Sequence, residues 1–307
     1  MSDDSFIDHL GADDVMAALA ETLAVTPPID VRRRVIAAAG ERPRPHAVPV
    51  PAPELYALRV AAMAELLDEL EGAEWSLPAD PYAWSVHELV AHVTVIEEYT
   101  ERQFGLTELP PIPAGLSTTI SHLDMGLDAV AELAAADVSV AVQRWGAAAG
   151  RVLDHVRSPA FDPAAPLPLH AWPFDAATAL VARSFEIWTH ADDIRRATGR
   201  PLDIPTPGEL RAMSSTSVGG LPVLLAITNG PAIQPTRVVL TGPGGGTYDL
   251  PAGSSNDPSH RHLLVADVVD YCRLAARRLD PTELRHQREG DPAYIDAMLR
   301  AAHAIAV

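Results

Sequence analysis

The chain has 307 residues, more than one hydrophobic core usually organises, so we expect more than one domain. Apolar residues make up 48% of it and charged residues 21%, a composition typical of a folded globular protein and not of a disordered one. The 41 acidic residues outnumber the 23 basic ones, and a net charge of −18 repels phosphate backbones and anionic lipid surfaces. We therefore expect no nucleic-acid and no membrane partner.

The single cysteine, Cys272, cannot close an intrachain disulfide. The first residues have neither the basic start nor the apolar run of a secretory signal, and the most apolar long stretch, residues 129–150, is interrupted by charged side chains. These features predict a cytoplasmic protein. All 23 basic residues are arginine, a bias typical of high-GC genomes that favours an actinobacterial source.

Residues 1–53 predict an N-terminal helical arm followed by a linker. Two short helices are expected over 13–25 and 29–39, on either side of a Pro-Pro pair, and prolines crowd residues 43–53. Such short segments bury little surface alone. We expect the arm to pack on its own bundle or a second subunit, or to present a helix to a protein partner.

Residues 54–204 predict a four-helix bundle. Apolar residues recur at spacings of three and four from residue 54 onward. Ser85 and Glu88 form a capping-box pattern that marks the start of the second helix, and Gly199 marks the end of the fourth. The expected helices cover residues 54–72, 85–104, 117–156 and 175–198, and one short and two longer connections between them indicate a bundle.

Residues 205–307 predict a small α+β domain. A helix is expected over 209–226, and segments 237–242 and 246–250 flank a glycine cluster as the two strands of a hairpin. Further helices are expected over 265–279 and 292–304, the last with Pro292 at its first position. The predicted fold class is thus α+β, a four-helix bundle followed by an α+β C-terminal domain.

The strongest chemical pattern lies in the fourth predicted helix. Glu186 and His190 are four residues apart, so both side chains leave the same helix face about one turn apart, a workable spacing for a metal. His92 sits on the apolar stripe of the second helix and should point into the bundle. Together the three form a His, Glu, His set that leaves an open coordination position, with Asp193 able to orient a ligand from behind.

Three other patterns do not predict a site. His87 and His92 are five residues apart, which places them about 140° apart around a helix, so they cannot share a metal. The glycine run Gly242–Gly246 lies between two strands and opens no helix, so it is read as a hairpin loop and not a phosphate cradle. Cys272 sits among apolar residues of a helix and is read as an inert buried residue.

Two motifs resemble a known family. Residues 84–92, WSVHELVAH, and residues 185–194, FEIWTHADDI, are similar to stretches of the mycothiol-dependent maleylpyruvate isomerase family, and residues 270–281 resemble its C-terminal domain. The resemblance implies a DinB-like bundle in which His92, Glu186 and His190 hold zinc, with mycothiol as the thiol cofactor. It also implies a catalytic arginine at Arg278, with Arg277 as the neighbouring alternative.

The predicted function is a zinc-dependent, mycothiol-using isomerase or S-transferase, whose partners are a small thiol and an electrophilic substrate. In the same reading Arg278 would hold a substrate carboxylate. One alternative is a metal-dependent hydrolase, in which Glu88 or Glu97 serves as base. Another is a thiol- or metal-sensing regulatory protein, since residues 25–39 faintly resemble a stretch of anti-sigma factors.

Overall fold

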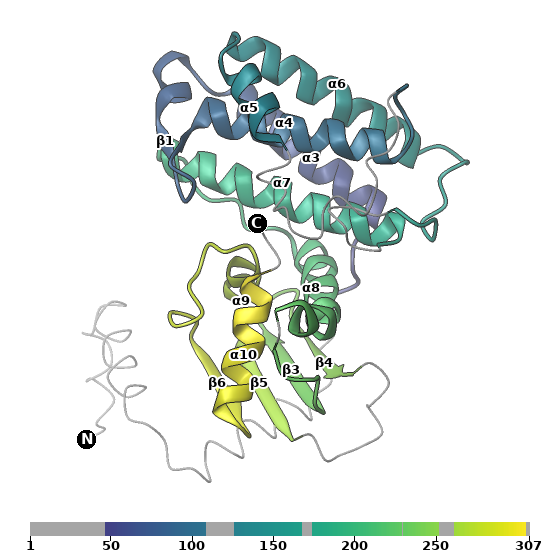
Figure 1. Cartoon of the computed structure of the whole chain (residues 1–307), viewed down its shortest axis with the longest axis vertical. Helices are drawn as coiled ribbons and strands as arrows, with labels where there is room; N and C mark the ends of the chain where they lie inside the picture. Colours follow the sequence, from purple (N-terminus) through teal and green to yellow (C-terminus); the bar gives the residue numbers. More distant parts are fainter. Residues whose placement is uncertain (1–46, 109–125, 168–173, 229, 252–260, 305–307) are drawn as a thin grey trace, which may run out of the picture. The chain divides into compact units, whose positions relative to one another are not determined.

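The structure is a computed structural model, and it describes residues 47–108, 126–167, 174–228, 230–251 and 261–304 (Figure 1). The predicted helical arm, apart from the end of its linker, lies outside the described residues. So does the beginning of the helix predicted over 117–156. Within the described residues a helical bundle is followed by an α+β domain, as the sequence predicts.

Four long helices form the bundle: α3 (Ala52–Asp68), α4 (Val86–Gln103), α6 (Val138–Val156) and α7 (Ala176–Thr198). A short helix α5 (Leu127–Ala134) precedes α6, and a 3-10 turn η2 (Gly72–Ser76) follows α3. Two very short antiparallel strands, β1 (Pro78–Ala79) and β2 (Trp84–Ser85), lead into α4. Figure 1 shows the four long helices side by side. Their apolar faces share one core.

Local chemistry determines where α4 and α7 begin and end. The Ser85 hydroxyl accepts a hydrogen bond from the Glu88 backbone N–H at 3.2 Å, and the Glu88 carboxylate accepts one from the Ser85 N–H at 2.7 Å. This is the predicted capping box, and it satisfies two N–H groups that the helix itself cannot pair. Gly199 ends α7 with φ of 70°, a left-handed conformation that suits glycine. Both predicted boundaries are confirmed.

The prediction of one continuous helix up to residue 156 is wrong. The chain leaves helical geometry between α5 and α6, where Asp137 adopts an extended backbone and caps α6. Its carboxylate accepts a hydrogen bond from the Ser139 backbone N–H at 2.9 Å. An aspartate in this position offers the backbone an alternative to the helix ladder, which explains the break.

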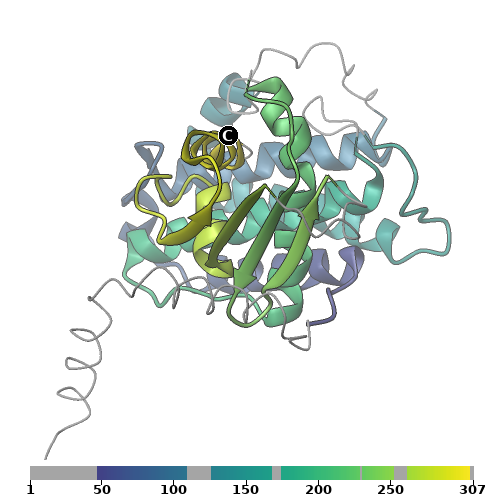
Figure 2. The same cartoon turned by 90° about the horizontal axis from the view of Figure 1, so that it is seen from below.

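The C-terminal domain is built from α8 (Pro207–Ile227), a four-stranded sheet, α9 (Val268–Ala275) and α10 (Pro292–His303). The strands are β3 (Thr236–Thr241), β4 (Gly246–Leu250), β5 (His262–Asp267) and β6 (His286–Glu289), in the spatial order β4-β3-β5-β6. β3 runs antiparallel to β4, as the predicted hairpin requires, and parallel to β5. Figure 2 shows these strands next to one another.

The helix predicted from residue 265 is wrong at its start, and the strands β5 and β6 were not predicted. Residues 262–267 alternate between buried and half-buried positions, as a strand with one face in the core does. Asp267 then caps α9, because its carboxylate accepts hydrogen bonds from the Val269 and Asp270 N–H groups. The helix therefore begins three residues later than expected.

The core of the C-terminal domain reaches into the bundle. Buried side chains of α8, α9, α10 and the sheet form one cluster with Leu55 of α3 and Phe185 and Trp188 of α7. Among the described helices, α8 alone is long and apolar enough to cross a membrane, but half of its most apolar window is buried in this core. Such burial is typical of a core helix in a folded domain.

Candidate metal centre

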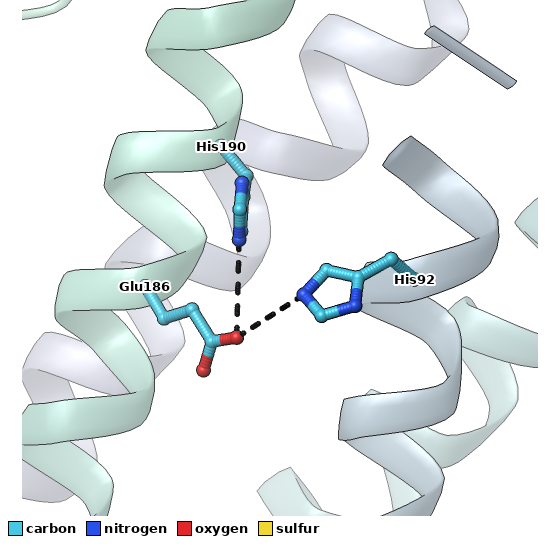
Figure 3. Close-up of side chains that lie close together, drawn as sticks. All are labelled: His92, Glu186 and His190. Atoms are coloured by element: carbon cyan, nitrogen blue, oxygen red, sulfur yellow. Dashed lines mark ion pairs between the residues drawn. The ribbon is translucent and has the colours of Figure 1, made fainter. Parts of the chain in front are cut away.

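His92, Glu186 and His190 meet inside the bundle, as the sequence predicts. Figure 3 shows Glu186 and His190 projecting from α7 toward His92 on α4. The Glu186 Oε1 atom lies 3.7 Å from His92 Nε2 and 3.8 Å from His190 Nε2. The two imidazole rings are 5.2 Å apart and nearly perpendicular. In the described part of the chain, these three residues form the group whose geometry could hold a metal ion.

The donor set fits a zinc-type cation. Two ligand atoms that each lie about 2.1 Å from a tetrahedral cation are separated by about 3.4 Å, close to the distances between Glu186 Oε1 and the two Nε2 atoms. Two imidazole nitrogens and one carboxylate oxygen are donors that zinc accepts, and three protein ligands leave a fourth position for another molecule. Both histidines are buried, and the Glu186 side chain is 14% exposed.

Asp193 orients His190 from behind. One turn beyond His190 on α7, the Asp193 Oδ2 atom lies 3.3 Å from His190 Nδ1. When the ionised carboxylate accepts the Nδ1 proton, the lone pair of Nε2 is left to face Glu186 and a cation. This is the arrangement that metal-binding histidines usually have, and the sequence predicted a supporting role for Asp193.

Arg278 of the C-terminal domain holds Asp193 in turn. Its Nε atom donates to Asp193 Oδ1 at 3.0 Å, and Nη2 donates to Oδ2. Its Nη1 atom donates to the Tyr82 hydroxyl at 3.2 Å and to the Ala276 carbonyl at 2.6 Å. Four of the five N–H groups of the guanidinium thus have protein acceptors, and the side chain is only 4% exposed.

In this arrangement Arg278 contacts both oxygens of Asp193, and its Nη2 atom lies 3.4 Å from His190 Nδ1. To bind a substrate carboxylate, as the family resemblance implies, Arg278 would have to release Asp193. The structure distinguishes Arg278 from its neighbour, because the side chain of Arg277 is exposed and its backbone adopts φ of 58°.

The electrostatics keep this set of residues in defined protonation states. Burial lowers the pKa of His190, which favours the neutral imidazole that a cation requires. Burial alone would raise the pKa of Asp193, but the hydrogen bonds from His190 and Arg278 outweigh it and hold that pKa below its ordinary value. Asp193 is therefore an anion beside a neutral His190.

Two aromatic rings stand next to the histidines. Trp84 lies 5.1 Å from the His92 ring, and Tyr82 lies 6.1 Å from the His190 ring. The guanidinium of Arg278 stacks over Tyr82 at 5.2 Å, a cation–π contact. Burial raises the pKa of Tyr82, so its hydroxyl stays protonated at neutral pH. The sequence did not predict a place for Tyr82, whose position depends on the loop between β1 and β2.

The remaining candidates have structural roles. Glu88 is held in the capping box, and the buried Glu97 is bonded to Tyr56 and Arg183, so neither is placed as a general base. His87 is outside the metal-binding group. Cys272 is wholly buried, and burial raises the pKa of its thiol to about 12. The glycine run 242–246 is the hairpin turn between β3 and β4.

Comparison with known proteins supports the family resemblance. Residues 56–195 match the family model of the mycothiol maleylpyruvate isomerase N-terminal domain. A crystal structure of the mycothiol-dependent maleylpyruvate isomerase is similar with a TM-score of 0.54 and 16% sequence identity, covering 77% of this chain and 91% of that chain. A histidine-to-alanine mutant of that enzyme gives 0.54 and 15% over the same shares. No curated protein sequence matches significantly.

The matched residues include all three candidate ligands, and the likeness to the crystal structures extends beyond the bundle. The resemblance to this family is thereby confirmed. So is the predicted α+β fold class, a helical bundle joined to a smaller domain with a sheet.

Proposed function

We propose that the protein is a cytoplasmic, zinc-dependent enzyme that uses mycothiol to isomerise a small electrophilic substrate or to transfer sulfur to it. The observation that supports this most is the convergence of His92, Glu186 and His190 within the residues that match the maleylpyruvate isomerase N-terminal domain. The neighbouring crystal structures are of an enzyme that depends on mycothiol.

The chain's own residues would hold the cation and leave it one open position. Asp193 orients His190, burial and the charge of Arg278 lower the pKa of His190, and the rings of Trp84 and Tyr82 stand beside the two histidines. The chemistry that zinc supplies when bound is to lower the pKa of a small thiol, so that the thiolate exists at neutral pH.

A thiolate can then act on an activated double bond. Its reversible addition to a double bond conjugated with a carbonyl, followed by its elimination as thiolate, would permit cis–trans isomerisation. If a leaving group departed from the attacked carbon instead, the result would be S-transfer.

Metal content tests the first part of the proposal. Purified protein should contain close to one equivalent of zinc by elemental analysis, and His190→Ala should lose it while keeping the helical circular dichroism of the wild type. Full metal retention in a folded His190→Ala variant contradicts the assignment of the ligands.

Thiol titration tests the second part. In cobalt-substituted protein, adding mycothiol should change the visible spectrum, because sulfur enters the open position. The same protein should turn over maleylpyruvate or another member of a panel of electrophiles only when the thiol is present. An unchanged spectrum together with no thiol-dependent turnover contradicts the proposal.

The hydrolase alternative makes the opposite prediction for the same samples. It requires hydrolysis of esters or amides without thiol, and its candidate bases Glu88 and Glu97 are both held in structural contacts. We therefore favour thiol chemistry.

A further inference from the structure

A chain of buried charged and polar groups runs from Glu186 away from the two histidines. The Glu186 Oε2 atom forms an ion pair with Arg183 Nη1 at 2.7 Å. Arg183 Nε donates to Glu97 Oε2 at 3.0 Å, and Arg183 Nη2 donates to the Val93 carbonyl at 3.2 Å. The Tyr56 hydroxyl donates to Glu97 Oε1. Helices α3, α4 and α7 each contribute to this chain, which we name the Arg183 relay: Tyr56, Glu97, Arg183 and Glu186.

Three of the four residues of the relay are fully buried, and Glu186 is half-buried. The side chains of Arg183 and Glu97 are both fully buried, and Tyr56 is as well. Moving two charges out of water is costly, and a buried ion pair adds little net stability compared with apolar residues of the same size. Stability of the bundle core therefore does not explain why these charged residues are buried together. A role in holding Glu186, at the half-buried end of the relay, would explain it.

The two oxygens of Glu186 face different partners. Oε1 faces His92 and His190, while Oε2 faces Arg183. Because Arg183 pairs with Oε2, the carboxylate is turned so that Oε1 is the oxygen placed to act as a donor to a cation.

We infer that Arg183 is a positioning residue for the proposed metal centre, which holds Glu186 as a one-oxygen ligand and is itself held in place by Glu97 and Tyr56. The inference rests on the proposed metal binding. It adds three supporting residues, Arg183, Glu97 and Tyr56, none of which contacts His92 or His190 through a candidate ligand nitrogen. It does not require Arg183 or Glu97 to take part in the reaction.

Arg183→Lys is the first test. Lysine keeps the positive charge but cannot reach Glu97, the Val93 carbonyl and Glu186 at once, because it lacks the planar fork. We expect cobalt and zinc to bind about 10- to 100-fold more weakly in competition with a chromophoric chelator, the loss typical of residues that support a metal ligand. We also expect a changed cobalt visible spectrum. Glu97→Gln should act in the same direction.

Arg59→Lys is the matched control. Arg59 is also a buried arginine between two carboxylates, at 2.8 Å from Asp203 and 2.7 Å from Glu209, but none of these three belongs to the metal-binding group. It should lower the midpoint of urea unfolding as Arg183→Lys does, yet leave cobalt affinity within about twofold and the spectrum unchanged. Equal effects of the two variants on cobalt affinity would show general destabilisation and overturn the inference.

Tyr56→Phe covers the case in which Arg183→Lys does not fold. It removes one hydroxyl from the far end of the relay and keeps the packing of the ring. We expect a several-fold loss of cobalt affinity with a shifted spectrum, and wild-type values for both would overturn the inference. If the wild-type protein binds neither cobalt nor zinc, the proposed function fails with it; if the wild type binds and these variants match it, only the inference fails.

Discussion

Asp193 of α7 and Arg278 of the C-terminal domain form a two-point ion pair, in which Nε and Nη2 of the guanidinium donate to the two carboxylate oxygens. Because Asp193 also faces His190 Nδ1, the orientation of a candidate metal ligand in the bundle depends on a residue of the other domain. The candidate metal centre is thus contacted by residues of both domains, although its three candidate ligands all come from the bundle.

Removing the charge of Asp193 should be strongly destabilising. Asp193→Asn leaves the Arg278 guanidinium buried and without an anionic partner, and a broken buried ion pair typically costs about 3–5 kcal/mol. Urea denaturation followed by circular dichroism should show this loss in the free energy of unfolding. Metal affinity should fall as well, because His190 loses its orienting acceptor.

Arg196→Gln is a control for that measurement. Arg196 also approaches Asp193, at 3.8 Å, but its side chain is 39% exposed, so its removal should cost less than about 1 kcal/mol. If both variants lowered the free energy of unfolding by a similar amount, the buried ion pair between Asp193 and Arg278 would not contribute more to stability than the exposed one.

The two histidines of α4 should differ in metal binding. His92→Ala should remove metal from the purified protein, whereas His87→Ala should retain about one equivalent, because His87 is outside the group of ligand atoms. Elemental analysis of both variants after dialysis against metal-free buffer measures this directly. Metal loss in His87→Ala alone would show that the ligand set is misassigned.

Cys272 should make stability fall at alkaline pH. Burial raises the pKa of its thiol from 9.0 to about 12, so above pH 9 the unfolded chain loses a proton that the folded chain keeps. The unfolded state then binds fewer protons, and the free energy of unfolding decreases by up to about 1.4 kcal/mol per pH unit. Cys272→Ala should have a flatter profile between pH 9 and 10.5 than the wild type. Parallel profiles would contradict the buried, protonated thiol.

The capping box of α4 should contribute measurably to stability. Ser85→Ala removes the oxygen that accepts the Glu88 N–H, and loss of such a cap typically costs about 1 kcal/mol. Thermal unfolding should show the corresponding lower midpoint. Cobalt affinity should remain that of the wild type, since His92 lies almost two turns into the helix; a large loss of affinity would mean that the cap also sets the position of the ligand.

The features that the sequence predicted correctly depend on residues close together in the chain. Ser85 and Glu88 are three residues apart, and Glu186 and His190 are four apart, so helix geometry alone brings each pair together. His92 was predicted from its position on an apolar stripe. In each case the periodicity of one helix contains the necessary information.

The features that the sequence did not reveal depend on distant segments. Strand β5 is followed directly by α9, and apolar residues stand on both sides of Asp267, so the local pattern does not show that residues 262–267 pair with β3 as a strand. Arg183 stands one turn before Glu186, but its role depends on Glu97 and Tyr56, which belong to other helices. A buried arginine has no sequence pattern that distinguishes it from an exposed one.

The three candidate ligands also bear on how the bundle opens. His92 and Glu186 are separated by about 90 residues of chain, which include α5 and α6. A cation bound to both would therefore cross-link α4 to α7 and close a long loop. Local unfolding of α5 or α6 would leave this metal cross-link in place, whereas separation of α4 from α7 would require release of the ion. Free metal at about 100 times its Kd would add about 2.7 kcal/mol to that separation alone. Amide exchange should therefore slow along the seam between α4 and α7 when metal is added, while exchange in α5 stays the same.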